Sequence, residues 1–374
     1  MSGLFNNKTI VILSPEDWGK NLLSKHLYAL ELSKNNTVYF IHTSAHNSQK
    51  DSVEVKKIDV NLFIVHLKSI PRGISKLPSF LIDLQTTYLI KKIKKKLALT
   101  KIDVVWSFDQ SKFQNLQQFN ATSTIFHPVD YIKKAQKFTS KIANSADVVL
   151  SVSNDILNSI STTTPKYFVN HGLDTLFLTP AKLENRPPYI SNTCINVGYV
   201  GNLQMKLLDW DNLIKTVKEN NHLNFIFIGP DKPSNIGGNV AFKELDVLKT
   251  LPNTHFTGEL SKEQLTSVFP FIDIFWLCYN QNKFPIEVSN SHKILEYLSS
   301  GKVVVSNFIS SYKNIPVLEM VNDNCDISAK IQSVAANIST LNANQLKNER
   351  INFASDNSYQ KQIQRIEQIL TSNK

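Results

Sequence analysis

Short apolar segments rich in β-branched and aromatic residues alternate with helical stretches along nearly the whole chain. This alternation is typical of α/β units, in which helices join parallel strands. The segments are almost continuously apolar, which predicts sheets that are buried on both faces. In the first half of the chain, the expected strands cover residues 9–13, 37–42, 62–67, 103–107, 123–127, 147–152 and 166–170.

The pattern breaks at residues 179–193, where prolines and polar residues predict a linker. Expected strands resume at residues 195–202, 224–230, 254–260, 273–279 and 302–307. We therefore predict two Rossmann-like, doubly wound α/β domains, at residues 1–180 and 194–352, with a linker at 181–193. Ligands of open α/β sheets bind beyond the carboxyl ends of the strands, so we expect the site in a cleft that both domains face. Residues 353–374 have apolar side chains at helical spacing and predict a terminal helix.

Several classes of protein do not fit the composition. No apolar run approaches the roughly 18 residues of a membrane-spanning helix, and the amino-terminal residues do not resemble a secretion signal, so we expect a cytoplasmic protein. The three cysteines lie far apart without zinc-binding spacing. Asp209 and Asp211 form an Asp-x-Asp motif, but they open an expected helix, where acidic residues are common. The G-x-G-x-x-G fingerprint of dinucleotide-binding enzymes is absent.

Positive charge is concentrated near the amino terminus. The net charge is +10, and the first 100 residues contain 15 Lys and Arg but 7 Asp and Glu. The densest run, residues 90–101, includes the lysines between Lys91 and Lys96. This run is either a solvated helix face or a surface that attracts an anionic membrane. Nucleic acid is not an expected partner, because no aromatic residues that could stack on bases are interleaved with the lysines.

Residues 289–306 are the most informative segment, and we expect them to form a turn, a helix, a glycine turn and a strand. The start of a helix has unpaired N–H groups and partial positive charge, so it can bind phosphate. Asn290 and Ser291 are good capping residues there, and Lys293 adds a full charge. Glu296 lies six residues beyond Asn290, roughly 9 Å along the helix axis. This is near enough to reach the ribose of a nucleotide whose diphosphate is bound at the helix start. The segment is therefore either a nucleotide site or an ordinary amphipathic helix whose polar side faces water.

The stretch NSHKILEYLSSGKVVVS resembles the donor-site signature of GT-B glycosyltransferases of the "glycosyl transferases group 1" superfamily. Other stretches match that family in order: VGYVGNLQMKLLDWDNLIK, NFIFIGP and LPNTHFTGELSKEQLTSVFPFIDIFWLCY in the second half, and YFVNHGLD at the end of the first. The likeness is at motif level in the second half and architectural in the first. Its EYLxxGK helix is most similar to bacterial surface-polysaccharide transferases.

This resemblance implies a GT-B fold whose C-terminal helix crosses back onto the N-terminal domain. It implies transfer of a sugar from a UDP- or GDP-type donor without a metal or another cofactor. Glu296 would hold the ribose, and Lys206 would neutralise the diphosphate as the nucleotide leaves. The donor-binding residues that the resemblance implies are Gly201, Asn202, Lys206, Gly229, Gly258, Glu259, Leu260, Asn290, Ser291, His292, Lys293 and Glu296.

Two positions depart from the family pattern. Many members have a second glutamate eight positions before the residue that matches Glu296, and this chain has Val288 there. Many also have an arginine after the first strand of the second domain, where this chain has Asn202 after Gly201. Lys206 would then be the main cation for the leaving group.

Candidates for the acceptor side lie after strands of the first half. Trp18 and Gly19 either contact a sugar or form a structured turn. By family likeness, His127 and Asp130 are catalytic candidates near the reacting sugar, and Asp109 is an acceptor-side candidate. The family group suggests retention of configuration, in which the departing phosphate takes the acceptor proton. An inverting enzyme would need a base within hydrogen-bond reach of the acceptor, and the sequence leaves both possibilities open.

Our leading hypothesis is a glycosyltransferase of cell-surface polysaccharide synthesis that uses a glycan or lipid-linked acceptor. We expect it in the cytoplasm or at the inner face of the cytoplasmic membrane. Two alternatives stay open: a degenerate GT-B protein that binds nucleotide or serves as a partner subunit, and a nucleotide-sugar epimerase on the same fold.

Overall fold

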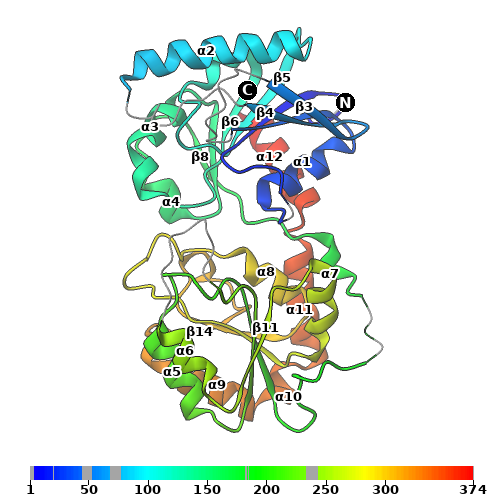
Figure 1. The fold of residues 1–374 in the computed structure, drawn as a ribbon, viewed down its shortest axis with the longest axis vertical. Coiled ribbons are helices and arrows are strands. Elements are labelled where there is room, and N and C mark those ends of the chain that lie inside the picture. Colours follow the sequence, from blue (N-terminus) through cyan, green and yellow to red (C-terminus); the bar gives the residue numbers. More distant parts are fainter. Residues whose placement is uncertain are drawn as a thin grey trace. The chain divides into compact units, whose positions relative to one another are not determined.

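The computed structural model describes residues 4–19, 21–43, 53–67, 77–181, 183, 185–232 and 243–373. The chain divides into two compact units. Unit 1 contains Met1–His171 and Tyr359–Lys374, and unit 2 contains Gly172–Ser358. Each unit has one sheet of largely parallel strands between helices (Figure 1). The two expected Rossmann-like α/β sheets are therefore confirmed.

Unit 1 contains an eight-stranded sheet. Its strands are β1 (Thr9–Ser14), β2 (Thr37–Thr43), β3 (Val53–Asp59), β4 (Leu62–Leu67), β5 (Ile102–Ser107), β6 (Ala121–Phe126), β7 (Val148–Ser151) and β8 (Lys166–Phe168). They lie in the order β3-β4-β2-β1-β5-β6-β7-β8, and among the strands of the described residues only the edge pair β3 and β4 is antiparallel. The order reverses at β1, which pairs with β2 on one side and with β5 on the other.

Two layers of helices cover this sheet, because successive side chains of a strand point to opposite faces. The helices of unit 1 are α1 (Ser24–Ser33), α2 (Ser79–Lys96), α3 (Gln136–Asn144), α4 (Asn154–Asn158) and α12 (Tyr359–Ser372), with 3-10 turns at Leu116–Phe119 and Lys133–Ala135. On β1, Ile10 and Ile12 belong to a core shared with α1 and α12. Val11 and Leu13 belong to the core shared with α2, α3 and α4.

The C-terminal helix α12 is part of unit 1. Tyr359, Ile366 and Leu370 are buried in the same core as Tyr28 of α1. The rings of Tyr28 and Tyr359 meet edge to face at 4.9 Å. The expected return of the C-terminal helix to the N-terminal domain is confirmed.

Unit 2 contains a six-stranded sheet whose paired strands are all parallel. Its strands are β9 (Asn196–Val200), β10 (Asn224–Ile228), β11 (Thr254–Gly258), β12 (Ile274–Leu277), β13 (Val303–Ser306) and β14 (Glu319–Met320). They lie in the order β11-β10-β9-β12-β13-β14. Along the chain, β10 and β11 are therefore added on one side of β9, and β12, β13 and β14 are then added on its other side.

The helices of unit 2 also form two layers (Figure 1). They are α5 (Trp210–Glu219), α6 (Lys243–Lys249), α7 (Lys262–Val268), α8 (His292–Ser299), α9 (Ile327–Ala336), α10 (Ile338–Leu341) and α11 (Asn344–Ser355). Four 3-10 turns lie at Thr175–Leu178, Phe269–Phe271, Ser310–Tyr312 and Asn324–Asp326. Helix α5 packs with α6 and α9, whereas α8 packs with α11.

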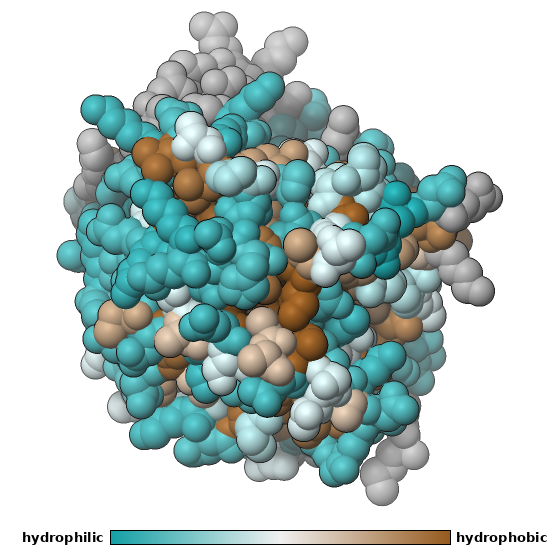
Figure 2. Space-filling view, turned by 90° about the horizontal axis from the view of Figure 1, so that it is seen from below, coloured by the Kyte–Doolittle hydropathy of each residue, from teal (hydrophilic) through white to brown (hydrophobic). Residues whose placement is uncertain are grey.

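The end of unit 2 that is lowest in Figure 1 has a largely hydrophilic surface. Figure 2 shows this end from below: hydrophilic side chains dominate, and hydrophobic ones gather mainly in a strip near the centre and in a patch toward the upper left. In the part of the chain that the structure describes, no helix is both long and apolar enough to cross a membrane.

Every expected strand corresponds to an observed one, but β3 and β14 were not expected. Beyond Val53, the side chains of β3 are all exposed, and the strand reads VEVKKID. Charged side chains are common on edge strands because they discourage pairing with other molecules. Such a strand lacks the apolar signal from which the other strands were predicted.

The packing of α12 on unit 1 gives the first prediction. Replacing the fully buried Ile366 by Ala leaves a cavity between α12 and the sheet. We expect Ile366→Ala to lower the free energy of unfolding of unit 1 by about 2–4 kcal/mol, measured by urea denaturation. The exposed Ser372→Ala, at the end of the same helix, is the control. Equal stability of the two variants would show that α12 is not part of the core of unit 1.

Candidate functional site

The strand order of unit 2 reverses between β9 and β12, and the loops that follow these two strands are bonded together. The backbone N–H of Asp209 donates to the carbonyl of Cys278 (2.9 Å), and that of Asn280 donates to the carbonyl of Leu207 (2.8 Å). Open α/β sheets bind their ligands at the carboxyl edge where the strand order reverses. The candidate site of unit 2 is therefore built from these loops and from α8, which follows the second of them.

Three glycines end the adjacent strands β9, β10 and β11 at this edge. The N–H of Gly201 donates to Ile228 (2.8 Å), and the N–H of Gly229 donates to the carbonyl of Gly258 (2.9 Å). Gly201 and Gly229 have φ values of +151° and +140°, which side chains disfavour. A Cβ at Gly229 would collide with the carbonyl oxygen of Gly201. The backbone can pack this closely because Gly229 has no side chain.

Helix α8 begins without a side-chain cap. Ser291 occupies the N-cap position, but its hydroxyl accepts no hydrogen bond from the first turn. The residue before it, Asn290, accepts a hydrogen bond through its Oδ1 from the N–H of Ser291 at 2.8 Å. By contrast, α5 is capped by Asp209 and α7 by Ser261. The start of α8 therefore keeps the positive end of its dipole uncompensated by a side chain, as an anion site requires.

Lys293, the second residue of α8, points into the unit. Its ammonium donates to the hydroxyl of Tyr279 (2.7 Å) and lies 5.2 Å from the ring centre of Tyr199. A Cβ on Gly201 would collide with this ammonium, so the charge lies directly beside the glycine. Burial lowers the pKa of Lys293, but the hydroxyls of Tyr199 and Tyr279 outweigh burial and raise it above its usual value. The site therefore contains a fixed positive charge under the loop that follows β9.

Glu296 lies one turn further along α8 and is half-buried. Burial raises the pKa of its carboxyl to about 7, against the opposing effect of Lys262 and Lys293. Among the described residues, none donates a hydrogen bond to this carboxylate. A half-buried carboxylate without donors is destabilising unless a ligand supplies them. Its position therefore suits a ligand with hydroxyl groups.

An ion pair that we did not predict lies near Glu296. The ammonium of Lys262, the first residue of α7, is 2.8 Å from Oδ2 of Asp174. Both charges act on the carboxyl of Glu296. Asp174 lies in the quoted run YFVNHGLD, so the sequence contained a signal for it. Lys262 begins a helix just after β11 and was missed.

The other predicted donor residues also lie at this edge of the sheet. Asn202 shapes the loop after β9, because its Oδ1 accepts from the N–H of Gln204 at 2.8 Å. Lys206 is exposed on that loop, with its ammonium 5.5 Å from the ring centre of Phe284. The remaining members are Gly258 and the exposed Glu259, the half-buried Leu260 and the exposed His292. Their roles toward a ligand stay predictions.

Two features of the sequence have structural explanations in unit 2. Val288, at the position of the family's second glutamate, is buried in the apolar core. Asp209 of the Asp-x-Asp motif caps α5 and also accepts from Nδ2 of Asn324 at 2.6 Å. Its carboxylate is therefore engaged in holding the fold together.

In unit 1, His127 is fully buried rather than exposed at a strand end. Its Nδ1 accepts from the indole N–H of Trp106 (3.2 Å), and its ring lies 5.0 Å from that of Phe108. Burial lowers the pKa of His127 to about 3, so the imidazole is neutral at physiological pH. The structure thus places this catalytic candidate inside an aromatic core, an environment that favours packing over proton transfer to a substrate.

The other unit 1 candidates differ in exposure. Asp109 is buried, and its Oδ1 accepts from the backbone N–H groups of Ser111 and Lys112, so it holds its own loop. Trp18 packs edge-on against Phe40 at 4.9 Å. Asp130 is exposed.

The surroundings of Asp130 are charged. Glu16 and Lys25, which are ion-paired with each other, are the charged groups that act on its carboxyl. Gly19 is exposed, with open space where a side chain would be. Asp130 and Gly19 are thus accessible, whereas Asp109 and His127 are not.

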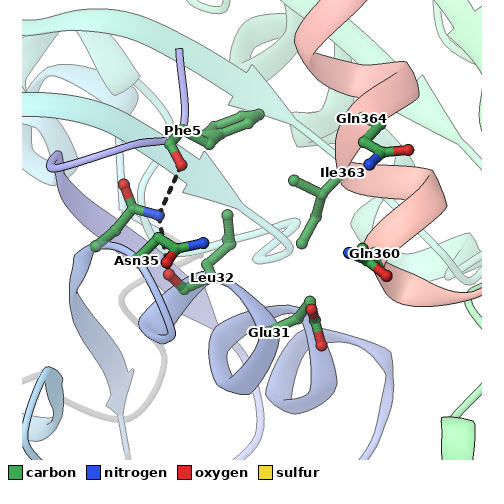
Figure 3. A pocket seen from close by; sticks show the side chains of 8 residues that line it. Phe5, Glu31, Leu32, Asn35, Gln360, Ile363 and Gln364 are labelled. Carbon is green, nitrogen blue, oxygen red and sulfur yellow. Dashed lines mark hydrogen bonds between the residues drawn. The ribbon is translucent and has the colours of Figure 1, made fainter. Parts of the chain in front are cut away.

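A cavity of about 150 Å³ lies elsewhere in unit 1, between α1, α12 and the amino-terminal segment. It is lined by Phe5, Glu31, Leu32, Asn35, Asn36, Gln360, Ile363 and Gln364 (Figure 3). Nδ2 of Asn36 donates to the carbonyls of Phe5 (3.1 Å) and Leu32 (2.9 Å). None of the predicted site residues lines this cavity, which is a gap in the packing of the returning helix.

No protein-family model and no curated protein matches the chain. Solved structures do match it over nearly its whole length. Sucrose-phosphate synthase from Thermosynechococcus elongatus is 14% identical, with 98% of this chain and 99% of that chain covered and a TM-score of 0.71. A UDP-forming α,α-trehalose-phosphate synthase from Burkholderia vietnamiensis is 10% identical, with coverages of 98% and 100% and a TM-score of 0.68.

HepE from Anabaena, solved in complex with UDP and glucose, is 13% identical, with coverages of 98% and 100% and a TM-score of 0.66. These similarities are structural, at identities too low to transfer a substrate. They show that the chain has the GT-B fold.

The raised pKa of Glu296 gives a prediction about stability. Between its ordinary value of 4.5 and about 7, the folded protein holds this proton more tightly than the unfolded chain does. The stability of unit 2 therefore falls as the pH rises through this window. Glu296→Gln, which cannot ionise, should be more stable than the wild type by about 1–3 kcal/mol at pH 8 and nearly equal at pH 5.

Urea denaturation at the two pH values measures this difference. The control is Glu287→Gln, at a half-buried glutamate nine residues earlier. A Glu296→Gln variant that is less stable than the wild type at pH 8 would mean that the carboxylate already has partners within the protein.

Proposed function

We propose that this protein is a glycosyltransferase that uses a nucleoside-diphosphate sugar. One observation carries the proposal: Glu296, a half-buried carboxylate to which no residue in the described part of the chain donates a hydrogen bond, lies one turn beyond an uncapped helix start that has Lys293 beneath it. This arrangement offers positive charge for a diphosphate and, further along the helix, an acceptor for hydroxyl groups. The GT-B fold, shared with the UDP-forming synthase and with HepE in complex with UDP and glucose, supports the proposal.

In the proposed donor complex, the diphosphate lies against the first turn of α8 and the loop after β9. The N–H groups from Asn290 to Lys293 and the charge of Lys293 bind it. Gly201 permits a close approach because it has no side chain to obstruct the phosphates. Glu296 accepts hydrogen bonds from the two ribose hydroxyls. Gly258, Glu259 and Leu260, after β11, frame the base.

In the proposed reaction, the bond between the anomeric carbon and the diphosphate oxygen breaks, and a bond to an acceptor hydroxyl oxygen forms. Negative charge then develops on the departing diphosphate. Lys206 and the helix dipole stabilise that charge without a metal ion. We propose retention of configuration, with the departing phosphate taking the acceptor proton. The burial of His127 supports this choice, because the imidazole is not at a surface where it could act as a base.

The proposed acceptor is a glycan or a lipid-linked saccharide of cell-surface polysaccharide synthesis, and the proposed location is the cytoplasm or the inner face of the cytoplasmic membrane. The EYLxxGK helix supports this assignment by resemblance. Asp130 and Trp18 of unit 1 are the proposed acceptor-side contacts, since Asp130 is exposed and Trp18 is only half-buried. The donor is proposed to be of the UDP type, as in the complex of HepE.

A second candidate function is nucleotide binding without transfer. The observation that favours it is the burial of Val288 in the apolar core, where many relatives by motif have a glutamate. In this case the protein would bind the donor but lack one contact to its sugar. The two functions differ in whether the sugar is transferred to an acceptor.

A thermal-shift panel of nucleotides and nucleotide sugars tests the donor site. We expect at least one UDP or GDP species to stabilise the wild type, by about 2.7 kcal/mol at 100 times its Kd. Glu296→Ala should abolish this stabilisation, whereas Glu287→Ala should keep it. No shift with any nucleotide would contradict the donor site, and mass analysis of an acceptor mixture would separate transfer from binding alone.

The role of Lys206 predicts a kinetic effect. Lys206→Ala removes the cation that stabilises the leaving diphosphate, so we expect kcat to fall about 100-fold, with a smaller change in KM for the donor. The control is Lys215→Ala, at an exposed lysine of α5. An unchanged kcat in Lys206→Ala would remove this residue from the proposed mechanism.

A further inference from the structure

Helix α2 of unit 1 exposes a stripe of large apolar side chains. Phe80, Leu84 and Tyr88 are 62%, 64% and 57% exposed, and Leu77 and Leu81 continue the stripe at its amino-terminal end. Residues four apart lie on one face of a helix, so these side chains form one continuous surface. We call this surface the α2 stripe. Monomeric proteins rarely expose such a continuous apolar surface unless it has a partner.

The α2 stripe faces outward because the opposite face of the helix is already anchored. Ile90 and Ile93 are buried in the core of unit 1. Oγ1 of Thr86 donates to Oε1 of Gln118 (2.7 Å), and Lys141 pairs with Asp83 (2.7 Å). The α2 stripe is therefore not a surface that unit 1 buries in its own core. Its side chains are exposed although the opposite face of α2 is packed against the rest of the unit.

Positive charge continues the stripe toward the end of the helix. Lys91, Lys95 and Lys96 are exposed there, and the ammonium of Lys92 lies 6.0 Å from the ring centre of Tyr88. Lys94 is used differently, since it donates to the carbonyl of Phe119 at 2.6 Å. The basic run that the sequence indicated is therefore only partly available to a partner.

The charges on α2 decide between possible occupants. Asp83 is the only acidic residue of the helix, and it is paired with Lys141. A second copy of the chain would offer its own α2 face no carboxylate for the exposed lysines. An anionic bilayer offers both an apolar layer and negative headgroups at the same depth. Tyrosine and lysine side chains are also well suited to the boundary between the two.

We infer that the α2 stripe docks unit 1 on an anionic lipid surface, with α2 lying flat in the headgroup region. Phe80, Leu84 and Tyr88 insert between the lipids, and Lys91, Lys95 and Lys96 contact the headgroups. This inference goes beyond the proposed function, because it rests on α2 alone and involves no residue of the donor site. If the acceptor is lipid-linked, the same docking keeps the enzyme where its acceptor is.

Co-sedimentation of the full chain with vesicles tests this docking. The vesicles contain either phosphatidylcholine alone or phosphatidylcholine with about one third phosphatidylglycerol, at low and high salt. We expect sedimentation with the anionic vesicles that weakens at high salt. The triple variant Lys91→Ser, Lys95→Ser, Lys96→Ser should bind them about 100-fold more weakly, or about fivefold for each lysine. The triple variant Phe80→Ser, Leu84→Ser, Tyr88→Ser should lose at least tenfold at either salt concentration.

Matched controls lie in unit 2. Val247→Ser replaces another exposed apolar side chain, and Lys215→Ser with Lys218→Ser replaces exposed lysines; all should bind like the wild type. Unchanged binding in the α2 variants, or wild-type protein that stays in the supernatant with anionic vesicles, would overturn the inference. A wild-type dimer that the apolar triple variant converts to monomer, without vesicle binding, would assign the stripe to a second copy instead. Because no nucleotide is present, these results are independent of the donor site.

Discussion

The candidate site of unit 2 depends on the close packing around Gly201. On one side, the carbonyl of Gly201 leaves no room for a Cβ on Gly229, and on the other the ammonium of Lys293 leaves none for a Cβ on Gly201 itself. The second contact places Lys293 of α8 beside the end of β9, so that a helix start and a buried charge meet at the point where the strand order reverses. A side chain at Gly229 would have to displace the backbone of Gly201, whereas one at Gly201 would have to displace the end of the Lys293 side chain.

Glu296 is unfavourable for the folded protein on its own. Its carboxyl is half-buried, no residue that the structure describes donates a hydrogen bond to it, and burial raises its pKa to about 7. Residues that cost stability in this way are typical of binding sites, because a ligand can supply the missing hydrogen bonds. The nearby pair of Lys262 and Asp174 keeps further charge beside this carboxyl. The unfavourable burial of the Glu296 carboxyl would therefore be relieved when a ligand with hydroxyl groups binds there.

The sequence predicted the strands, the two sheets and the edge of unit 2 where the predicted donor residues lie, because buried parallel strands have a strong apolar signal and glycines mark their ends. It did not predict β3, whose exposed, charged side chains hide its strand character.

The sequence also contained no sign that His127 would be inside an aromatic core, because its burial depends on the packing of Trp106 and Phe108 against it. Nor could it pair Tyr279 with Lys293 or Asp174 with Lys262, since these contacts join residues that are distant in the chain. The apolar side of α2 was present in the sequence, but whether that side faces the core or solvent depends on tertiary packing.

The central claim is that the carboxyl of Glu296 accepts hydrogen bonds from a nucleotide. Carbon-13 NMR of selectively labelled glutamate, with the signal of Glu296 assigned from its loss in Glu296→Gln, measures this directly. The account predicts that the carboxyl titrates near pH 7 in the free protein. It also predicts that saturating UDP or GDP moves the midpoint toward acid, because the ribose hydroxyls stabilise the ionised form. A midpoint near 4.5 in the free protein, or a signal that no nucleotide changes, would contradict the account.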